Sequence, residues 1–230
     1  MAQYRLNILR PSVNNLSARV FMRAAGLDFE EVDVWGHTME PEYLGKYAPH
    51  LTPTLEDPDL PGGTLGESCA IMAYLCNKHG LDQFYPTAPG ERARVDNANL
   101  YHTGTFYPYL ARATYPTLGF PQYAGEVGPS EASDDLKAQA VKDATEAAAD
   151  SLASYERFFL GDRKFVGGDR PSIADIRMAA SLEFLRSIDF PFSARIEQLR
   201  SDVEEALGDA YSEPAADVRG FVQQAKAQVA

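Results

Sequence analysis

The stretch Thr52-Pro53-Thr54-Leu55-Glu56, with Asp57-Pro58-Asp59-Leu60-Pro61-Gly62-Gly63 and Thr64-Leu65 behind it, decides the first half of the fold. Its two strand-like pieces are short, and the proline and glycine residues between them are typical of a turn. A helical pattern follows from Ser68 to His79 and is closed by Gly80. We therefore predict two strands joined by a turn, followed directly by a helix.

Upstream of this stretch, the chain alternates between strand-like and helix-like segments. Residues 4–9 alternate apolar and polar side chains with a period of two, which is typical of a strand. A helical stretch then ends at Gly26, residues 29–34 form a second strand-like segment, and a short helix is expected over residues 41–47. The predicted order is β-α-β-α-β-β-α, with a parallel crossover first and a hairpin last. This pattern is thioredoxin-like.

The chain changes character near residue 86. Residues 86–91, Pro-Thr-Ala-Pro-Gly-Glu, read as a proline-rich linker, and the chain beyond them is nearly all helix-like. The predicted fold class is an α/β thioredoxin-like N-terminal domain followed by an all-α C-terminal domain. We assign residues 1–85 to the first domain, 86–91 to the linker and 92–230 to the second domain.

Several helical patterns make up the second domain. One runs from about Glu91 through Leu110, and shorter terminal helices are expected near Pro191 and Pro214. In another, from about Ser133 to Phe159, apolar residues recur at steps of three and four and are expected to face inward; they are Leu136, Ala140, Val141, Ala144, Ala148, Leu152, Tyr155 and Phe159. Pro171-Ser172-Ile173-Ala174-Asp175 opens a further helix, with Ser172 and Asp175 as a capping box.

The acidic composition narrows the classes of function. The chain of 230 residues carries 21 basic and 33 acidic side chains, a formal net charge of -12. A nucleic-acid surface needs a basic cluster to neutralise phosphates, and none is seen, so no nucleic-acid partner is expected. No stretch approaches the roughly 20 apolar residues of a membrane span, and the two cysteines do not suggest a disulfide framework. We expect a soluble, cytoplasmic protein.

Four local features stand in order along the chain: Ser12-Val13-Asn14-Asn15, Thr52-Pro53-Thr54-Leu55, Glu67-Ser68 and the cap from Ser172 to Asp175. In this order and spacing, the chain resembles the cytosolic glutathione transferases over almost its whole length. Residues 99–107, Asn-Leu-Tyr-His-Thr-Gly-Thr-Phe-Tyr, are also similar to the first long helix of the theta, delta and epsilon-type branches. The resemblance implies glutathione as co-substrate, no metal or nucleotide cofactor, and a homodimer.

The resemblance implies a cis peptide bond between Thr52 and Pro53. Proline has no N–H group to donate to a strand, and the cis form of such a bond costs only about 0.5–1 kcal/mol. In the family, the cis bond leaves the backbone of the preceding residue, here Thr52, free to pair with the cysteine of glutathione. An ordinary trans turn proline is the alternative.

Glu67 and Ser68 suit the γ-glutamyl end of glutathione, which carries an α-carboxylate and an α-ammonium. The N-terminus of a helix attracts anions, so Ser68 and its helix suit the carboxylate, while Glu67 suits the ammonium. Plain helix capping by Ser68 is compatible with this role. Related chains usually carry threonine before the glutamate, where this chain has Gly66.

Ser12 is the candidate activator of the glutathione thiol, because theta-like relatives use a serine at this place as a donor to the sulfur. A hydroxyl donor stabilises the thiolate over the thiol and lowers its pKa. Asn14 is the rival, since its amide group can also donate. Ser12 could instead only start the turn or cap the helix. No cysteine lies here, so mixed-disulfide chemistry is not supported.

His37 and His50 are candidates for contacting the glycine carboxylate of glutathione. His50 precedes Thr52-Pro53, close to where delta-like relatives carry a histidine, but Leu51 replaces the lysine often found nearby. A surface role is the alternative for each histidine. The four histidines show no metal-ligand spacing, so we predict no metal site.

An aromatic run marks the expected pocket for the second substrate; its members are Tyr101, Phe106, Tyr107, Tyr109, Tyr115, Phe120 and Tyr123. By the resemblance, Tyr107 and Tyr115 are the residues expected to line this pocket, which suits a flat or halogenated organic compound. Burial in the core is the alternative for these aromatics. Cys69 and Cys76 share a helix face and are expected to be buried and inert.

The expected function is a glutathione transferase that conjugates the glutathione thiolate to a hydrophobic electrophile, as in detoxification. Two alternatives stay open. The first is a glutathione-dependent enzyme that cleaves ethers, removes halogen or isomerises its substrate. The second is a non-catalytic binding module of the same fold.

Overall fold

The computed structural model describes residues 2–120 and 133–229 and begins with a four-stranded sheet. Its strands are β1 (Tyr4–Ile8), β2 (Phe29–Asp33), β3 (Thr54–Glu56) and β4 (Thr64–Gly66), in the order β2-β1-β3-β4. β1 pairs with β2 in parallel, whereas β3 is antiparallel to both β1 and β4. The parallel crossover and the hairpin predicted from the sequence are both confirmed.

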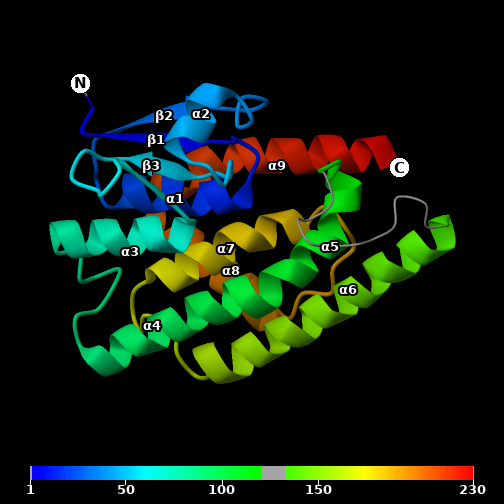
Figure 1. Cartoon of the computed structure of the whole chain (residues 1–230). Coiled ribbons are helices and arrows are strands. Elements are labelled where there is room, and N and C mark those ends of the chain that lie inside the picture. The colour runs from blue at the N-terminus through cyan, green and yellow to red at the C-terminus, as the bar shows by residue number, and fades with distance from the viewer. Residues whose placement is uncertain (1, 121–132, 230) are drawn as a thin grey trace.

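Three helices accompany the sheet: α1 (Val13–Ala24), α2 (Pro41–Lys46) and α3 (Ser68–His79). α1 and α3 lie on the side of the sheet that faces the rest of the molecule, and α2 lies on the other side (Figure 1). Gly26 and Gly80 both adopt a positive φ just after α1 and α3, as expected for glycines that end helices. The predicted order β-α-β-α-β-β-α is confirmed.

Beyond the sheet, the described chain is helical. The elements are α4 (Pro89–Tyr101), η1 (His102–Phe106), α5 (Tyr107–Leu118), α6 (Asp134–Tyr155), η2 (Glu156–Leu160), α7 (Ile173–Leu185), α8 (Ala194–Leu207) and α9 (Asp209–Val229). η1 and η2 are single π-helical turns. η1 joins α4 directly to α5, so the helix expected through Leu110 continues to Leu118.

Two expectations about the second half are wrong. α9 is 21 residues long and contains Pro214, so the proline does not divide it into a short helix. Leu136 is 63% exposed and Ala140 is also exposed, although the period of α6 placed both inward. The reason is spatial, because the first turns of α6 extend beyond the end of α5, and no other described helix covers them there (Figure 1). Ala144, Ala148, Leu152, Tyr155 and Phe159 of the same stripe are buried.

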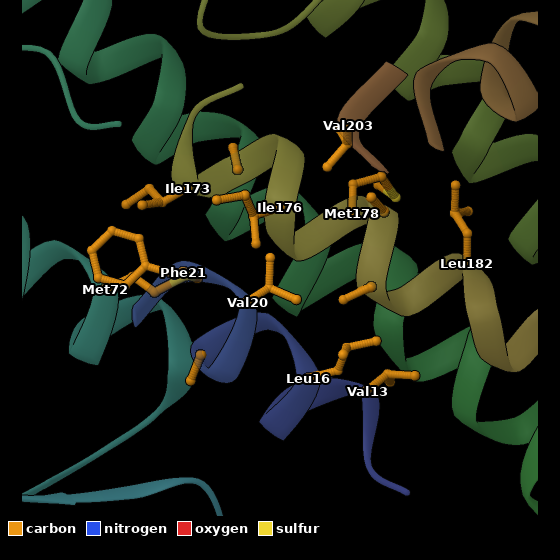
Figure 2. Packing of buried hydrophobic residues seen from close by; sticks show 14 of the residues in the cluster. Val13, Leu16, Val20, Phe21, Met72, Ile173, Ile176, Met178, Leu182 and Val203 are labelled. Carbon is orange, nitrogen blue, oxygen red and sulfur yellow. The ribbon is translucent and has the colours of Figure 1, made fainter. Parts of the chain in front are cut away.

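The two halves share one hydrophobic core. Val13, Leu16 and Val20 of α1 point toward Ile176 and other apolar residues of α7, as Figure 2 shows. These side chains are fully buried, and they belong to one continuous cluster with residues of α3, α4 and α5. α1 therefore contributes side chains to the core beside the sheet and to the core of the helical half.

A buried ion pair also joins the two halves. The guanidinium of Arg19 on α1 is 2% exposed and lies 2.9 Å from carboxylate oxygens of both Glu31 on β2 and Asp217 on α9. A buried charge of this kind needs such partners, because desolvation without them is costly. The contact fixes α9 against α1 and β2.

The capping box predicted at the start of α7 is confirmed. The Ser172 hydroxyl accepts a hydrogen bond from the N–H of Ala174, and the Asp175 carboxylate accepts from the N–H of Ser172 at 2.9 Å. The same carboxylate accepts from the N–H groups of Val166 and Gly167 at 2.8 and 3.2 Å. Asp175 therefore ties the preceding loop to the helix that carries the shared core.

Asp57, in the β3–β4 turn, gives the stability a pH dependence. Burial raises the pKa of this carboxyl, but hydrogen bonds from Lys78, from the N–H of Asp59 and from Tyr74 outweigh burial and lower the pKa below its usual range. A depressed folded-state pKa adds stability above the unfolded-state pKa, and this stability is lost as the pH falls through the folded value. We expect Asp57→Asn to lower the free energy of unfolding by about 2 kcal/mol at pH 7.

Urea unfolding at pH 7 and at about pH 3 tests this prediction, because the difference between the variant and the wild type should shrink at the lower pH. Asp59→Asn is the matched control: its side chain is 71% exposed and binds the same Lys78 at 2.8 Å. A pH-independent loss in Asp57→Asn would contradict the prediction.

Candidate functional site

Apart from the two histidines, the predicted site residues of the first half lie on three neighbouring segments. In the sheet, Thr54 is paired with Gly66, so the chain before β3 and the chain after β4 end on the same side. The Nδ2 atom of Asn15 donates to the Thr52 hydroxyl at 3.0 Å, which joins the first turn of α1 to the loop before β3. The structure therefore brings the start of α1, Thr52-Pro53 and Glu67-Ser68 to one edge. Asn15 was missed because a buried asparagine in a helix has no distinctive local pattern.

The peptide bond between Thr52 and Pro53 is cis, as predicted. The loop around it is held by its own hydrogen bonds. The Tyr43 hydroxyl donates to the carbonyl of Leu51 at 2.7 Å and lies 2.8 Å from the hydroxyl of Thr54. Thr54 donates to the same carbonyl at 3.0 Å. Tyr43 on α2 thus fixes the loop from one side while Asn15 on α1 fixes it from the other.

Glu67 is the N-cap residue of α3 and has an unusual backbone conformation. Its φ of 65° lies in the left-handed region, which is uncommon for a residue with a side chain and often marks a functional site. Its side chain is exposed and caps nothing. Ser68 is buried and is the first residue of the helix rather than its cap, so the expected capping by Ser68 is wrong. Although Glu67 occupies the N-cap position, its side chain makes no capping hydrogen bond, and Ser68 lies inside the helix.

The ring of Tyr47 leaves no space for a side chain at Gly66, the residue before Glu67. A Cβ atom added to Gly66 would lie 2.0 Å from the hydroxyl oxygen of Tyr47 and 2.2 Å from the ring carbon that carries it, so this ring fills the space beside the strand. Burial raises the pKa of Tyr47, and the carboxylate of Glu67 raises it further. The threonine usual in the family would clash here.

Ser12 is the N-cap residue of α1, but its hydroxyl makes no capping hydrogen bond. Its backbone is bound normally, since its N–H donates to the Leu9 carbonyl and its carbonyl accepts from the N–H of Leu16. The side chain is half-buried. The alternative in which Ser12 caps the helix through its side chain is therefore wrong, and the hydroxyl lies at the positive end of α1.

Asn14 reaches across to the second half of the chain. Its Nδ2 atom donates to the Tyr107 hydroxyl at 2.9 Å, and the Tyr107 and Tyr115 hydroxyls are 3.0 Å apart. The structure thus connects three predicted site residues that are up to 101 positions apart in the sequence, since 115 minus 14 is 101. Tyr107 is buried and Tyr115 partly buried, so this pair lies at the edge of the core.

His37 and His50 lie apart from this connected set. Both side chains are exposed, and His37 Nδ1 is 2.7 Å from the carboxylate of Glu40. His50 has a φ of 50° and its N–H donates to the Tyr47 carbonyl. No hydrogen bond within the described part of the chain links either ring to Ser12, Thr52 or Glu67.

Aromatic rings form a wall beside Tyr115. Phe120 is the centre of this wall: its ring centroid is 5.3 Å from Tyr115, 5.7 Å from Phe184 and 5.4 Å from Phe221. Trp35, after β2, reaches the same ring at 6.1 Å and is 51% exposed. Trp35, Phe184 and Phe221 were missed, because no local pattern relates segments this far apart.

The predicted aromatic run belongs largely to the core. Phe106 and Tyr107 are buried, and Tyr101, Tyr109, Tyr115 and Phe120 pack against the core. Tyr123 lies outside the described residues.

The cysteines and possible metal ligands add no site. Cys76 is buried, and burial raises its pKa to about 12, so its thiol is inert, as predicted. Cys69 is only partly buried, and both cysteines are free. The described residues hold no group of three or more His, Cys, Asp or Glu side chains placed to bind a metal ion. They also include no helix that is long and apolar enough to cross a membrane.

Comparisons with known proteins agree with this architecture. Family models described as "Glutathione S-transferase, N-terminal domain" and "Glutathione S-transferase, C-terminal domain" match residues 12–87 and 138–209. Glutathione S-transferase theta-1 of Gallus gallus is 29% identical over 162 residues, which cover 68% of this chain but only 57% of that relative.

Solved structures share the fold over nearly the whole chain. A delta-class glutathione transferase of Nilaparvata lugens has a TM-score of 0.75 and 27% identity over 97% of this chain and 99% of its own. Human glutathione transferase theta-2, in complex with glutathione and an unknown ligand, has a TM-score of 0.81 and 23% identity. The match covers 98% of this chain and 91% of the human chain. The predicted fold class is confirmed, and the chain belongs to the cytosolic glutathione transferase superfamily, a class of transferase enzymes.

Proposed function

We propose that this chain is a glutathione transferase that joins the sulfur of glutathione to an electrophilic carbon of a hydrophobic compound. The observation that carries the proposal is the junction of three segments at one edge of the sheet: Asn15 binds Thr52, and Thr54 pairs with Gly66 next to Glu67. This junction offers a helix N-terminus, an exposed carboxylate and a serine hydroxyl within one small region.

The γ-glutamyl end of glutathione binds at Glu67 and Ser68. The ammonium group suits the Glu67 carboxylate, which is exposed and caps no helix. The α-carboxylate suits the N-terminus of α3, where backbone N–H groups and the helix dipole favour an anion. The Thr52 backbone then pairs with the cysteine residue of glutathione, and His37 and His50 are the candidates for its glycine carboxylate.

The thiol is activated at the N-terminus of α1. The Ser12 hydroxyl is not used as a cap, so it can donate to the sulfur, and Asn14 is the second donor in reach of this turn. The thiol proton leaves to solvent, the thiolate lone pair forms the new S–C bond, and a leaving group departs with its bonding electrons. Thiolate formation and proximity of the two reactants supply the rate increase.

The second substrate binds against the aromatic wall around Phe120. Tyr115 contributes a ring to this wall and a hydroxyl to the pair with Tyr107. An apolar surface with a small number of polar groups suits a flat or halogenated organic compound. We place this function in a cytoplasmic homodimer that acts in detoxification, with residues 1–85 binding glutathione and residues 92–230 binding the second substrate.

Glutathione binding at Glu67 is tested with Glu67→Gln, which removes the charge and keeps the shape. We expect the dissociation constant for glutathione to rise about tenfold or more, because a charge-assisted hydrogen bond contributes about 1.5–3 kcal/mol. Trp35, the only tryptophan, lies beside Phe120, so its fluorescence serves as the readout alongside retention on immobilised glutathione.

Glu42→Gln is the matched control, because Glu42 is also an exposed glutamate at the start of a helix and pairs with Lys46 rather than with a proposed glutathione ligand. We expect its dissociation constant to change less than that of Glu67→Gln. Failure of the wild type to bind glutathione at millimolar concentration would reject the proposed function.

A further inference from the structure

Arg177 is a buried, positively charged residue that lies against the ring of Tyr107. This arginine of α7 is 4% exposed, and its guanidinium carbon is 5.1 Å from the centroid of the Tyr107 ring. Its Nη1 atom donates to the Ser181 hydroxyl at 3.2 Å, whereas its Nε atom has no hydrogen-bond partner. The described residues give Arg177 no carboxylate partner, unlike Arg19, the other buried arginine, which has two.

Stability alone does not account for this arginine. A buried charge without a counter-ion is costly, and replacing buried charges by apolar side chains of similar volume is often neutral or stabilising. The ring of Tyr107 offsets part of this cost, since a cation beside an aromatic face is attracted to it. The remaining cost leaves this buried charge without an explanation in stability, which directs attention to what lies around it.

The π-helical turn η1 brings the neighbours of Arg177 together. In this turn, the N–H of Tyr107 donates to the carbonyl of His102, five residues earlier. Residues five apart in an α-helix lie on different faces, but here the two rings are 5.9 Å apart. The Nε2 atom of His102 is 2.8 Å from the hydroxyl of Ser181. Both rings therefore meet the same part of α7.

Arg177 is the positively charged group beside the buried rings of His102 and Tyr107. Burial, and then the charge of Arg177, hold the pKa of His102 well below its usual range, so the imidazole is neutral. Burial, together with Asp175, raises the pKa of Tyr155 on α6, so this phenol is neutral as well. Asp175, on α7 itself, is bound by backbone N–H groups and the Ser172 hydroxyl. On α1, Arg19 is held by Glu31 and Asp217.

A short path leads from this charge to the start of α1. The Tyr107 hydroxyl accepts from the Asn14 amide at 2.9 Å. Asn14 lies in the first turn of α1, two residues after Ser12. One ring and one amide therefore separate the guanidinium from the place proposed for the glutathione sulfur.

We propose that Arg177 is a positioning residue for the thiolate of bound glutathione: its charge holds Tyr107 and Asn14 in place and favours negative charge on the sulfur. The inference rests on the proposed function, since it concerns the bound thiol. By Coulomb's law, a unit charge on the order of 10 Å away, at an effective dielectric constant of about 20, lowers a thiol pKa by about one unit.

The test measures the ionisation of glutathione bound to the wild type, Arg177→Met and Arg177→Lys, by the ultraviolet absorbance of the thiolate across pH. We expect Arg177→Met to raise the pKa of the bound thiol by about one unit and Arg177→Lys to restore most of the difference, because lysine keeps the charge. Urea unfolding of Arg177→Met should be no easier than that of the wild type. A purely structural role predicts the reverse, a less stable protein with an unchanged thiol pKa.

Tyr107→Phe keeps the inference testable if Arg177→Met does not fold. This variant keeps Arg177 and the aromatic ring but removes the hydroxyl that binds Asn14. We expect its bound thiol pKa to rise as well. An unchanged thiol pKa in the folded Met variant, or in Tyr107→Phe where only that variant folds, would overturn the inference while leaving the proposed function intact. No thiolate signal from the wild type at millimolar glutathione would overturn both.

Discussion

Ser12→Ala should lose most of the thiolate of bound glutathione. A free thiol has a pKa of about 8.5, and lowering it by about two units is worth roughly 2.7 kcal/mol, which a charge-assisted hydrogen bond and a helix N-terminus can supply. Loss of this donor would cut the thiolate fraction at pH 7 by up to about 20-fold, the limit in which the hydroxyl supplies the whole shift, and the rate of conjugation would fall with it. Ultraviolet titration of the bound thiol and the pH profile of kcat/KM measure the two effects.

The structure separates this effect from helix capping. Because the Ser12 hydroxyl makes no capping bond, Ser12→Ala should change the free energy of unfolding by less than about 0.5 kcal/mol. Ser193→Ala is the matched control: Ser193 is also an N-cap residue, but its hydroxyl accepts from the N–H of Ile196 at 3.1 Å. Its loss should cost about 1 kcal/mol without changing the thiol pKa.

Asn14→Ala decides between the two donors. If Ser12 activates the thiol, the Asn14 variant keeps most of the thiolate, and the shift in its thiol pKa is smaller than that of Ser12→Ala. An unchanged thiol pKa in Ser12→Ala, with a large rise in Asn14→Ala, would transfer the role to Asn14.

Asp175→Ala should be among the most destabilising substitutions in this chain. The carboxylate is fully buried and accepts four hydrogen bonds: from the N–H groups of Val166, Gly167 and Ser172, and from the Ser172 hydroxyl. Leaving buried donors unpaired costs about 1–3 kcal/mol each, so we expect a loss of about 3 kcal/mol or more. For a chain of this size, the unfolding temperature would fall by roughly 10 °C.

Asp134→Ala is the control for Asp175→Ala. Asp134 also lies in the first turn of a helix behind an N-cap serine, but its side chain is fully exposed. Thermal unfolding of this variant should stay within about 0.5 kcal/mol of the wild type. Equal stability of the two variants would contradict the importance that we assign to the capping box.

The sequence predicts best the features that depend on residues close together in the chain. The bounds of α3 and the capping box of α7 are of this kind, because helix caps and helix-ending glycines act over a few residues. The same holds for the β3–β4 hairpin. Family resemblance supplied the site residues, and the structure brings those of the first half to one edge, except His37 and His50, which lie apart from the others.

The rest could not be predicted, because it depends on which segments meet in space. The bond between Asn14 and Tyr107 spans 93 positions, and the contact between Trp35 and Phe120 joins the first half of the chain to the end of α5. Arg177 follows the capping box by two residues but takes no part in this motif, so only its burial and its neighbours mark it. The prediction that Leu136 is buried was wrong for the same reason. A helical period predicts which side chains share a face, but not whether another element covers that face.

The position of α1 limits how this chain can be recombined with its relatives. The first turn of this helix carries Ser12 and Asn14, while Val13, Leu16 and Val20 complete the core with α7. A chimera that takes its first half from one relative and its second half from another would therefore create a mismatched interface directly beneath the first turn of α1, where we propose that the thiol binds. Such hybrids need α1 and α7 from the same parent.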